Sequence, residues 1–382
     1  TFKASSQSTS LTDKEPDATL HALFKPVDAN TINVLVPESG LFEGVPVVRD
    51  GKLSEEAKKA LENTYDTESS PDPVALETFT ASVDGASDTR VTGKSVTITL
   101  ASDVLFDSDS ADLSAQADTT LKKAADQLST YPGGQVTIVG HTDDVADDAH
   151  NQDLSQRRAQ AVSDRLGQLA SMSAYSVSVS GKGESEPRVP NDSDENRQLN
   201  RRVEITLVPT QESSTKSPTG TSKDADKGSG KGGGDLPKAE GPVAKGSEGV
   251  TVKRGGGDDK LTFVLKEVTR RGKYLVGEVK ATGGPGGTKT GPADWLQPTQ
   301  LAGSARGEED TKLLGAITGL SLLTAQTRYY PVDYTTAQGA HHPLSEITAD
   351  NKLGDGDATT LTVVWPDTGQ DSVTLDLEPS KR

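Results

Sequence analysis

The segment Val136–Arg158 reads VTIVGHTDDVADDAHNQDLSQRR and joins a short apolar strand to a helix through an acidic loop. Alternation of apolar residues over Gln135–Val139 predicts the strand, and helical spacing predicts a helix that begins near Asp153. The predicted buried stripe of this helix consists of Leu154, Val162, Leu166 and Leu169. Arg158 falls inside that stripe, where a cation is unexpected. Arg158 and the carboxylate of Asp143, fifteen residues upstream, are therefore the first candidates for a functional site.

The neighbouring segments extend this strand and helix into a domain over residues 93–210. Alternation in SVTITL predicts an earlier strand, and Ser114 is the expected cap of a helix that ends before Tyr131–Gly134. A third strand, YSVSVSGKG, is followed by a loop over residues 183–200 and by a fourth strand, RRVEITLV, that ends near Pro209. The order β-α-β-α-β-loop-β predicts a compact α/β domain with helices packed on a mixed sheet.

Three further regions flank this domain and predict a multidomain protein. Residues 1–92 are expected to be an N-terminal extension or a small α+β segment, with a strand at Thr31–Val36 and a helix at Ser54–Tyr65. Residues 211–249 are rich in Gly, Ser and Lys and lack apolar periodicity, which predicts a flexible linker between domains that act independently. Short alternating strands over residues 250–382 predict an all-β, immunoglobulin-like sandwich.

The composition limits the class of partner and the chemistry. A formal net charge of −17 and a pI near 4.8 argue against nucleic acid and anionic membranes as partners. The absence of cysteine excludes disulfides, thiolate nucleophiles and Cys-ligated metals. No apolar run approaches the ~20 residues needed to cross a bilayer. Because the chain begins with Thr1, we expect it to be processed or trimmed, with any signal peptide or lipid-bearing residue upstream.

Five separated motifs in the central domain occur in an order typical of one family. They are LFDSDSADL (105–113), VGHTD (139–143), NQDLSQRRAQAV (151–162), GKGESEP (181–187) with Asn191, and RQLNRRVEI (197–205). Together they make Ser95–Val208, close to a third of the chain, resemble the OmpA-like peptidoglycan-binding domain. Any one of these motifs alone would be a weak signal.

The resemblance implies noncovalent binding of the peptide stem of the cell wall through the free end of diaminopimelate. It implies that Asp143 binds the ligand ammonium and Arg158 its carboxylate, because a zwitterion needs one anion and one bidentate cation a few ångströms apart. Asn151 and Arg201 fall at further pocket positions, and Asp109 at a supporting polar position. The resemblance implies no catalytic residue, metal or cofactor. It places the protein in the cell envelope outside the cytoplasm, periplasmic or wall-associated, among outer-membrane and lipoprotein relatives.

The acidic loop departs from the family pattern. Ala146 stands where the family commonly has Gly, and His150 stands where it commonly has Tyr. Four extra acids also crowd the loop and helix start: Asp144, Asp147, Asp148 and Asp153. These changes bear on which stem peptide is preferred more than on the fold.

Other interpretations of the same residues remain open at the level of sequence. Asp143 and Arg158 could form an internal salt bridge that only fastens the loop to the helix. The His141–His150 acidic cluster could hold a divalent metal in a hydrolase. A third alternative is an adhesive or scaffolding protein whose central fold has no ligand and whose outer regions, the C-terminal sandwich among them, bind proteins. The pair His341–His342 is expected in a solvated turn.

Overall fold

The structure is a computed structural model of the 382-residue chain, and it describes part of that chain. The described residues are 3–4, 22–23, 28–36, 40–49, 52, 55, 76–210, 236–239, 241–253, 259–296, 306, 315–335, 341–344, 346–347 and 352–377. Of the helix predicted at Ser54–Tyr65, only Glu55 is among them. The predicted linker, residues 211–249, is described only at 236–239 and 241–249, which contain no helix or strand.

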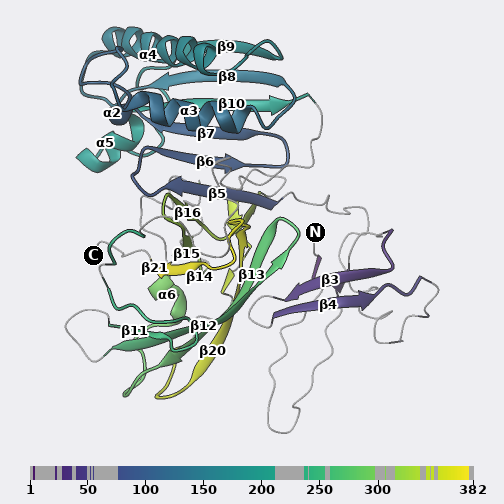
Figure 1. Ribbon diagram of the computed structural model, residues 1–382. Coiled ribbons are helices and arrows are strands. Elements are labelled where there is room, and N and C mark those ends of the chain that lie inside the picture. The colour runs from purple at the N-terminus through teal and green to yellow at the C-terminus, as the bar shows by residue number, and fades with distance from the viewer. Residues whose placement is uncertain are drawn as a thin grey trace.

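A mixed sheet, at the top of the view in Figure 1, forms the central domain and confirms the predicted strands. Its strands in this region are β7 (Val96–Ala101), β8 (Gly134–His141), β9 (Tyr175–Gly181) and β10 (Arg202–Pro209). Strand β10 lies between β7 and β8 and is antiparallel to both, whereas β8 and β9 are parallel. A parallel pair needs a crossover connection, and helix α4 (Asp148–Leu169) provides it.

Two helices, α3 (Ala117–Leu128) and α4, bury their apolar faces on this sheet. The N-cap position of α3 is Gln116 and not the predicted Ser114, and its side chain makes no capping hydrogen bond. Ser114 still supports the start of the helix, because its Oγ accepts hydrogen bonds from the backbone N of Gln116 and of Ala117, each at 3.2 Å. Helix α4 begins five residues before the predicted Asp153, because Asp147 caps it by accepting from the backbone N of His150 at 2.9 Å.

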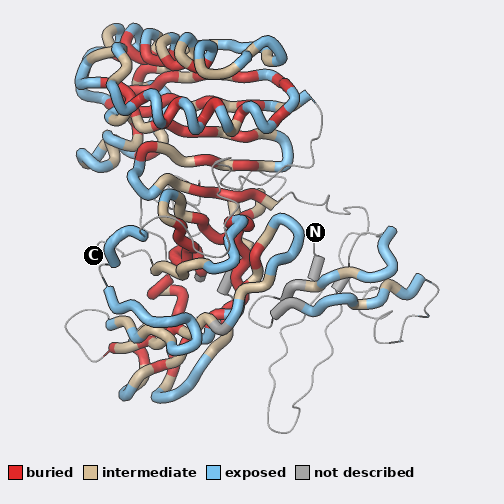
Figure 2. Tube along the Cα trace, viewed as in Figure 1, coloured by how far each residue is buried: buried red, intermediate tan, exposed pale blue. Residues whose placement is uncertain are grey.

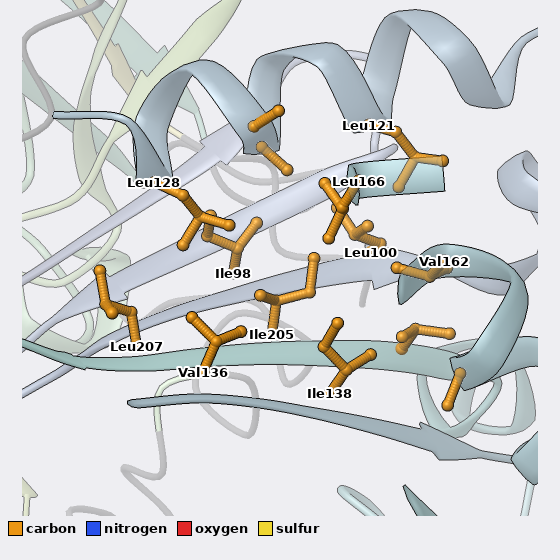
Figure 3. Packing of buried hydrophobic residues seen from close by; sticks show 14 of the residues in the cluster. Ile98, Leu100, Leu121, Leu128, Val136, Ile138, Val162, Leu166, Ile205 and Leu207 are labelled. Atoms are coloured by element: carbon orange, nitrogen blue, oxygen red, sulfur yellow. The ribbon is translucent and has the colours of Figure 1, made fainter. Parts of the chain in front are cut away.

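The core between these helices and the sheet is apolar and tightly enclosed (Figure 3). The labelled side chains come from β7, α3, β8, α4 and β10, and all are at most 2 % exposed: Ile98, Leu100, Leu121, Leu128, Val136, Ile138, Val162, Leu166, Ile205 and Leu207. Burial of each such side chain contributes roughly 1.5–3 kcal/mol. This core fixes the strand ends and the helix start that carry the candidate site.

Two short helices differ from the predicted pattern. Helix α2 (Ser102–Leu105) follows β7 directly, and helix α5 (Asp194–Asn200) lies in the stretch predicted to be a loop. Ser193 caps α5 by accepting from the backbone N of Asn196 at 3.1 Å, and Asp194 and Glu195 occupy its first turn. The capping pattern was present in the sequence, but the helix is too short to show an apolar periodicity.

Strands from the predicted N-terminal region extend the central sheet. Strand β6 (Ser87–Val91) pairs with β7, and β5 (Leu76–Ser82) pairs with β6. Farther upstream, β3 (Thr31–Val36) coincides with the predicted strand and pairs with β4 (Gly40–Pro46) as a hairpin whose described side chains are mostly exposed (Figure 2). Strands β1 (Lys3–Ala4) and β2 (Ala22–Leu23) pair with each other.

The described part of the C-terminal region is rich in β-strands, as predicted, and forms a four-stranded sheet, a two-stranded sheet and part of the central sheet. The four-stranded sheet has the order β11-β12-β13-β20, made of β11 (Val250–Lys253), β12 (Lys260–Arg271), β13 (Tyr274–Gly283) and β20 (Ala358–Pro366). It shares an apolar core with helix α6 (Pro292–Leu296), β15 (Leu320–Leu323) and β16 (Thr327–Tyr329), and Trp365 is fully buried there. Strands β14 (Gly315–Ala316) and β19 (Glu346–Ile347) form a separate pair.

The C-terminal region and the central domain share one continuous sheet through β5. Strand β16 pairs with β5, β15 pairs with β16, and β21 (Thr374–Leu377) pairs with β15. Strand β17 (Asp333–Thr335) also pairs with β5, and with β18 (His341–Pro343). Figure 1 shows β5 lying between the two regions. In the ranges that the structure describes, no helix is long and apolar enough to cross a membrane.

Candidate functional site

The ends of three neighbouring strands converge at one end of the central sheet. In the strand register, Arg202 of β10 lies opposite Ala101 at the end of β7 and opposite His141 at the end of β8. The residues just beyond these ends, Asp103, Asp143 and Arg201, are therefore brought together although they are far apart in sequence. Helix α4 starts at the same end, because the loop after β8 leads directly into it.

Asn151 holds the acidic loop in place from the first turn of α4. This asparagine is buried, and its Nδ2 donates to the carbonyl oxygens of Asp143 and Ala146, each at 3.2 Å, and to Oε2 of Glu184 at 2.6 Å. The backbone N of Thr142 donates to the carbonyl of Gly183 at 2.9 Å. Asn151 therefore positions the loop that carries Asp143.

Arg158 is a buried cation whose contacts are neutral. It is 4 % exposed, and its Nε donates to the carbonyl of Ser110 at 2.8 Å, with Nη2 at 3.5 Å from the carbonyl of Asp107. Its guanidinium carbon lies 5.2 Å from the ring centroid of Phe106. Within residues 76–210, no carboxylate forms an ion pair with it. Burial lowers the pKa of Arg158, yet arginine stays protonated at neutral pH, so Arg158 remains a buried cation with no direct ion pair in the described part of the chain.

Asp143 is mostly buried and forms its ion pair with Arg201. Nη1 of Arg201 donates to Oδ2 of Asp143 at 2.6 Å, while Oδ1 of Asp143 accepts only from the backbone N of Val145, at 3.3 Å. Arg201 also makes two hydrogen bonds with Asp103, at 2.8 and 2.7 Å. The hydrogen-bonded Asp103 carboxylate raises the pKa of Arg201. The alternative of an Asp143–Arg158 salt bridge is therefore wrong, because Asp143 forms its ion pair with Arg201.

Asp109 lies at the edge of the site rather than beside Asp143. It is the one non-glycine residue with positive φ (56°) in the described part of the chain, and it sits in the turn whose carbonyls accept from Arg158. Its Oδ1 lies 2.6 Å from Nε2 of His150, a residue in the first turn of α4. Arg158 and His150 thus connect the turn over residues 107–110 to helix α4 at two points.

Three site residues were not singled out from the sequence: Asp103, Glu184 and Arg197. Arg197 of α5 donates to Oδ1 of Asp144 at 2.9 Å, which gives one of the extra loop acids a partner. Glu184 lay inside the GKGESEP motif, and Asp103 directly preceded VLFD, but nothing local indicated their partners. Those partners lie far away in sequence and meet them only through the pairing of strands.

The residues of the acidic cluster make separate contacts. In the described ranges, no group of three or more His, Asp or Glu residues is arranged to hold an ion. Asp147 caps α4, Asp153 pairs with Arg157, and His150 contacts Asp109. His141 is buried with neither ring nitrogen hydrogen-bonded, and burial, followed by the charge of Arg202, lowers its pKa to about 4. The predicted cluster is thus divided among separate contacts.

The fold and the site define an α/β domain with a charged site at one end of its sheet. Residues 105–201 match the model of the OmpA family, and this region of the chain is an OmpA-like domain. Outer membrane porin F of Pseudomonas aeruginosa is 42 % identical over 102 residues, which cover 27 % of this chain and 29 % of that protein. The probable lipoprotein YiaD of Escherichia coli is 36 % identical over 125 residues, covering 33 % and 56 %.

A solved structure described as the cell wall anchor of the T6SS from Pseudomonas aeruginosa is also similar. It is 33 % identical, with 32 % of this chain and 88 % of that one covered and a TM-score of 0.29. The chain spans less than two thirds of the length of these curated relatives, 29 % of porin F and 56 % of YiaD. The family match lies within the central domain, at residues 105–201.

Proposed function

We propose that the OmpA-like domain binds cell-wall peptidoglycan noncovalently, through the diaminopimelate end of the stem peptide. In this proposal the ligand ammonium meets Asp143 and the ligand carboxylate meets Arg158. Asn151 positions the loop, Arg201 holds the Asp143 carboxylate, and Asp109 lies at the rim. The domain acts by binding and not by catalysis, and it uses no metal or cofactor.

The observation that carries this proposal is the buried guanidinium of Arg158, whose hydrogen bonds go to carbonyl oxygens and not to a carboxylate. A charge out of water is costly unless it is paired, so a site that keeps one unpaired is suited to an incoming anion. Arginine binds a carboxylate through two parallel hydrogen bonds, which gives both strength and orientation. Asp143, with one oxygen held only by a long backbone contact, is suited to accept from an ammonium.

The family and the names of the relatives support the cellular setting of this proposal. The relatives are called outer membrane porin F, outer membrane protein A and a probable lipoprotein. We therefore place this chain in the cell envelope, outside the cytoplasm, where it tethers an envelope protein to the wall. Four regions, 1–92, 93–210, 211–249 and 250–382, form the proposed division of the chain. The last is proposed as an immunoglobulin-like sandwich that binds a protein partner.

Sedimentation with purified cell-wall sacculi tests the proposed site. The full chain should sediment with sacculi, and Asp143→Ala and Arg158→Ala should each weaken binding at least about tenfold, since each removes charge-assisted hydrogen bonds. Asp126→Ala and Arg165→Ala are the matched controls, because each removes one partner of an exposed pair elsewhere in this domain. Wild-type affinity in both site variants would contradict the assignment.

A scaffolding role without a cell-wall ligand is the competing proposal, and titration separates the two. A stem peptide that ends in diaminopimelate should release or absorb heat with the full chain. An absence of heat, together with an absence of sedimentation, would favour the scaffolding role.

A further inference from the structure

We propose that Asp103 is a positioning residue of this binding site. It neutralises Arg201, and so leaves Asp143 with the net negative charge that an ammonium group requires. This inference rests on the proposed function and deepens it, because it assigns the charge of the ammonium subsite to a residue that touches no ligand.

The geometry of the three side chains supports this role. Arg201 makes two hydrogen bonds with Asp103, at 2.8 and 2.7 Å, and one with Asp143, at 2.6 Å. Asp103 therefore holds Nε and Nη2 of the guanidinium, and Nη1 alone is directed at Asp143. A planar guanidinium that is held through two of its nitrogens presents the third nitrogen in a fixed direction.

The backbone fixes the same arrangement. The backbone N of Ser102 donates to the carbonyl of Arg201 at 3.0 Å, and the backbone N of Arg201 donates to the carbonyl of Arg197, also at 3.0 Å. Asp103 thus follows a residue that is hydrogen-bonded to Arg201 itself. The end of β7 and the start of β10 place the two side chains side by side.

The charge balance gives the reason for a second carboxylate. Asp103, Asp143 and Arg201 together carry two negative charges and one positive charge, so the triad has a net charge of minus one. Arg158 adds one positive charge nearby. Burial lowers its pKa, and the charges of Asp103, Asp109, Arg201 and Asp143 also influence that pKa. Without the rim carboxylate of Asp109, the triad and Arg158 sum to zero charge and are divided into an anionic and a cationic half, which matches a zwitterionic amino-acid end.

Without Asp103, the same site would have the wrong charge for an ammonium. Asp143 and Arg201 would form a neutral pair, and these two side chains together with Arg158 would carry a net positive charge. An incoming ammonium would then meet a mostly buried carboxylate that is already satisfied. Exposure rises along the triad, from 12 % for the Asp143 side chain to 28 % for Arg201 and 37 % for Asp103, so solvent screens part of this effect.

Titration of the full chain with two matched probes tests the role of Asp103. The first probe is a stem peptide that ends in diaminopimelate, and the second is the same peptide with the free ammonium replaced by hydrogen. Asp103→Asn should bind the first probe about fivefold more weakly, the effect expected for one charge at a partly exposed site. Its binding of the second probe should not weaken, because that probe needs only Arg158.

A charge-restoring double variant separates electrostatics from structure. Asp103→Asn with Arg201→Gln leaves Asp143 alone and returns the triad to a net charge of minus one. It should bind the first probe more tightly than Asp103→Asn does, whereas a purely structural role predicts a further loss. Asp126→Asn is the control for the removal of an exposed carboxylate elsewhere in the domain.

Each outcome bears on the inference in a defined way. Equal binding of the first probe by wild type and Asp103→Asn overturns the role of Asp103 and leaves the proposed function intact. An equal loss for both probes, or no recovery in the double variant, also overturns it. A wild-type chain that binds neither probe nor sacculi overturns the proposed function itself, and the inference with it.

Discussion

Two buried arginines in this chain have opposite surroundings. Arg158 of the central domain meets only carbonyl oxygens and the Phe106 ring. Arg306, 1 % exposed, forms a two-point ion pair with Asp333 and donates to the carbonyl of Pro331 at 2.7 Å. Its guanidinium also lies over the rings of Phe79 and Tyr330, at 6.0 and 5.3 Å.

The difference separates a charge used for folding from a charge available for binding. Arg306 and Asp333 satisfy each other beside β5, the strand through which the C-terminal region joins the central sheet. Nearby, Glu77 of β5 accepts from Thr335 at 2.5 Å and lies 3.1 Å from Nδ1 of His341. His341, expected in a solvated turn, is instead half-buried in β18. The buried charged residues at the β5 junction thus form ion pairs, whereas Arg158 has none in the described part of the chain.

The largest expected effect on stability comes from breaking the buried ion pair between Arg306 and Asp333. Asp333→Ala should lower the free energy of unfolding by about 3–5 kcal/mol, because it leaves Arg306 buried without its counterion. Urea unfolding at neutral pH measures this change. Asp376→Ala is the matched control, since its partner Arg328 is partly exposed and the expected loss is about 1 kcal/mol or less. Equal losses in the two variants would mean that the Arg306 pair does not stabilise the junction.

The next largest expected effect is a pH dependence of stability, and it comes from the buried ring of His141. His141 has a folded-state pKa of about 4 against an ordinary value of 6.5, because burial and then Arg202 disfavour its charged form. The unfolded chain therefore binds the proton first as the pH falls. Stability from this group is complete above pH 6.5 and is lost toward pH 4, by about 3 kcal/mol at most.

Unfolding curves between pH 7 and pH 4 measure this loss. His141→Phe should unfold with a shallower pH dependence over this range than the wild type. His150→Gln is the control, because its ring is partly exposed and is already paired with Asp109. A wild-type pH dependence that His141→Phe leaves unchanged would contradict a neutral buried ring.

Local patterns in the sequence were sufficient for the central elements. Alternation located β7, β8, β9 and β10, and helical spacing located α3 and α4. Arg158 stood out because a cation interrupted an apolar stripe, and Asp143 because of its motif. These features depend on residues within a few turns of one another, which is the range that periodicity reports.

Contacts between distant residues could not be predicted in the same way. Arg201 meets Asp103 only because β7 and β10 are neighbours in the sheet, and Glu184 meets Asn151 only because β9 lies beside β8 and α4. The pairing of β5 with β16 depends likewise on strands separated by more than two hundred residues. The early start of α4 depends on a single cap, Asp147, within a run of acids that sequence alone does not distinguish.

The smallest expected change in stability is for the replacement of Arg158, the buried cation without an ion pair. Arg158→Met keeps most of the apolar stem and removes the unpaired guanidinium. The relief of desolvation offsets the lost hydrogen bonds to Ser110 and Asp107, so the free energy of unfolding should change by about 1 kcal/mol or less. Arg202→Met is the matched control within the same domain, because it leaves Glu204 without its partner and should cost about 2 kcal/mol.

Added ligand then distinguishes a cation that binds ligand from a cation that is only part of the fold. A stem peptide at a hundred times its dissociation constant should stabilise the wild-type chain by about 2.7 kcal/mol, because ligand binds the folded state alone. The same peptide should leave Arg158→Met unchanged, since its carboxylate has no cation to meet. A large loss of stability in Arg158→Met without ligand would make Arg158 a structural cation like Arg306, and the contrast between the two sites would fail. A small loss together with absent ligand stabilisation would mean that the cost of burying Arg158 is offset only when the site is filled.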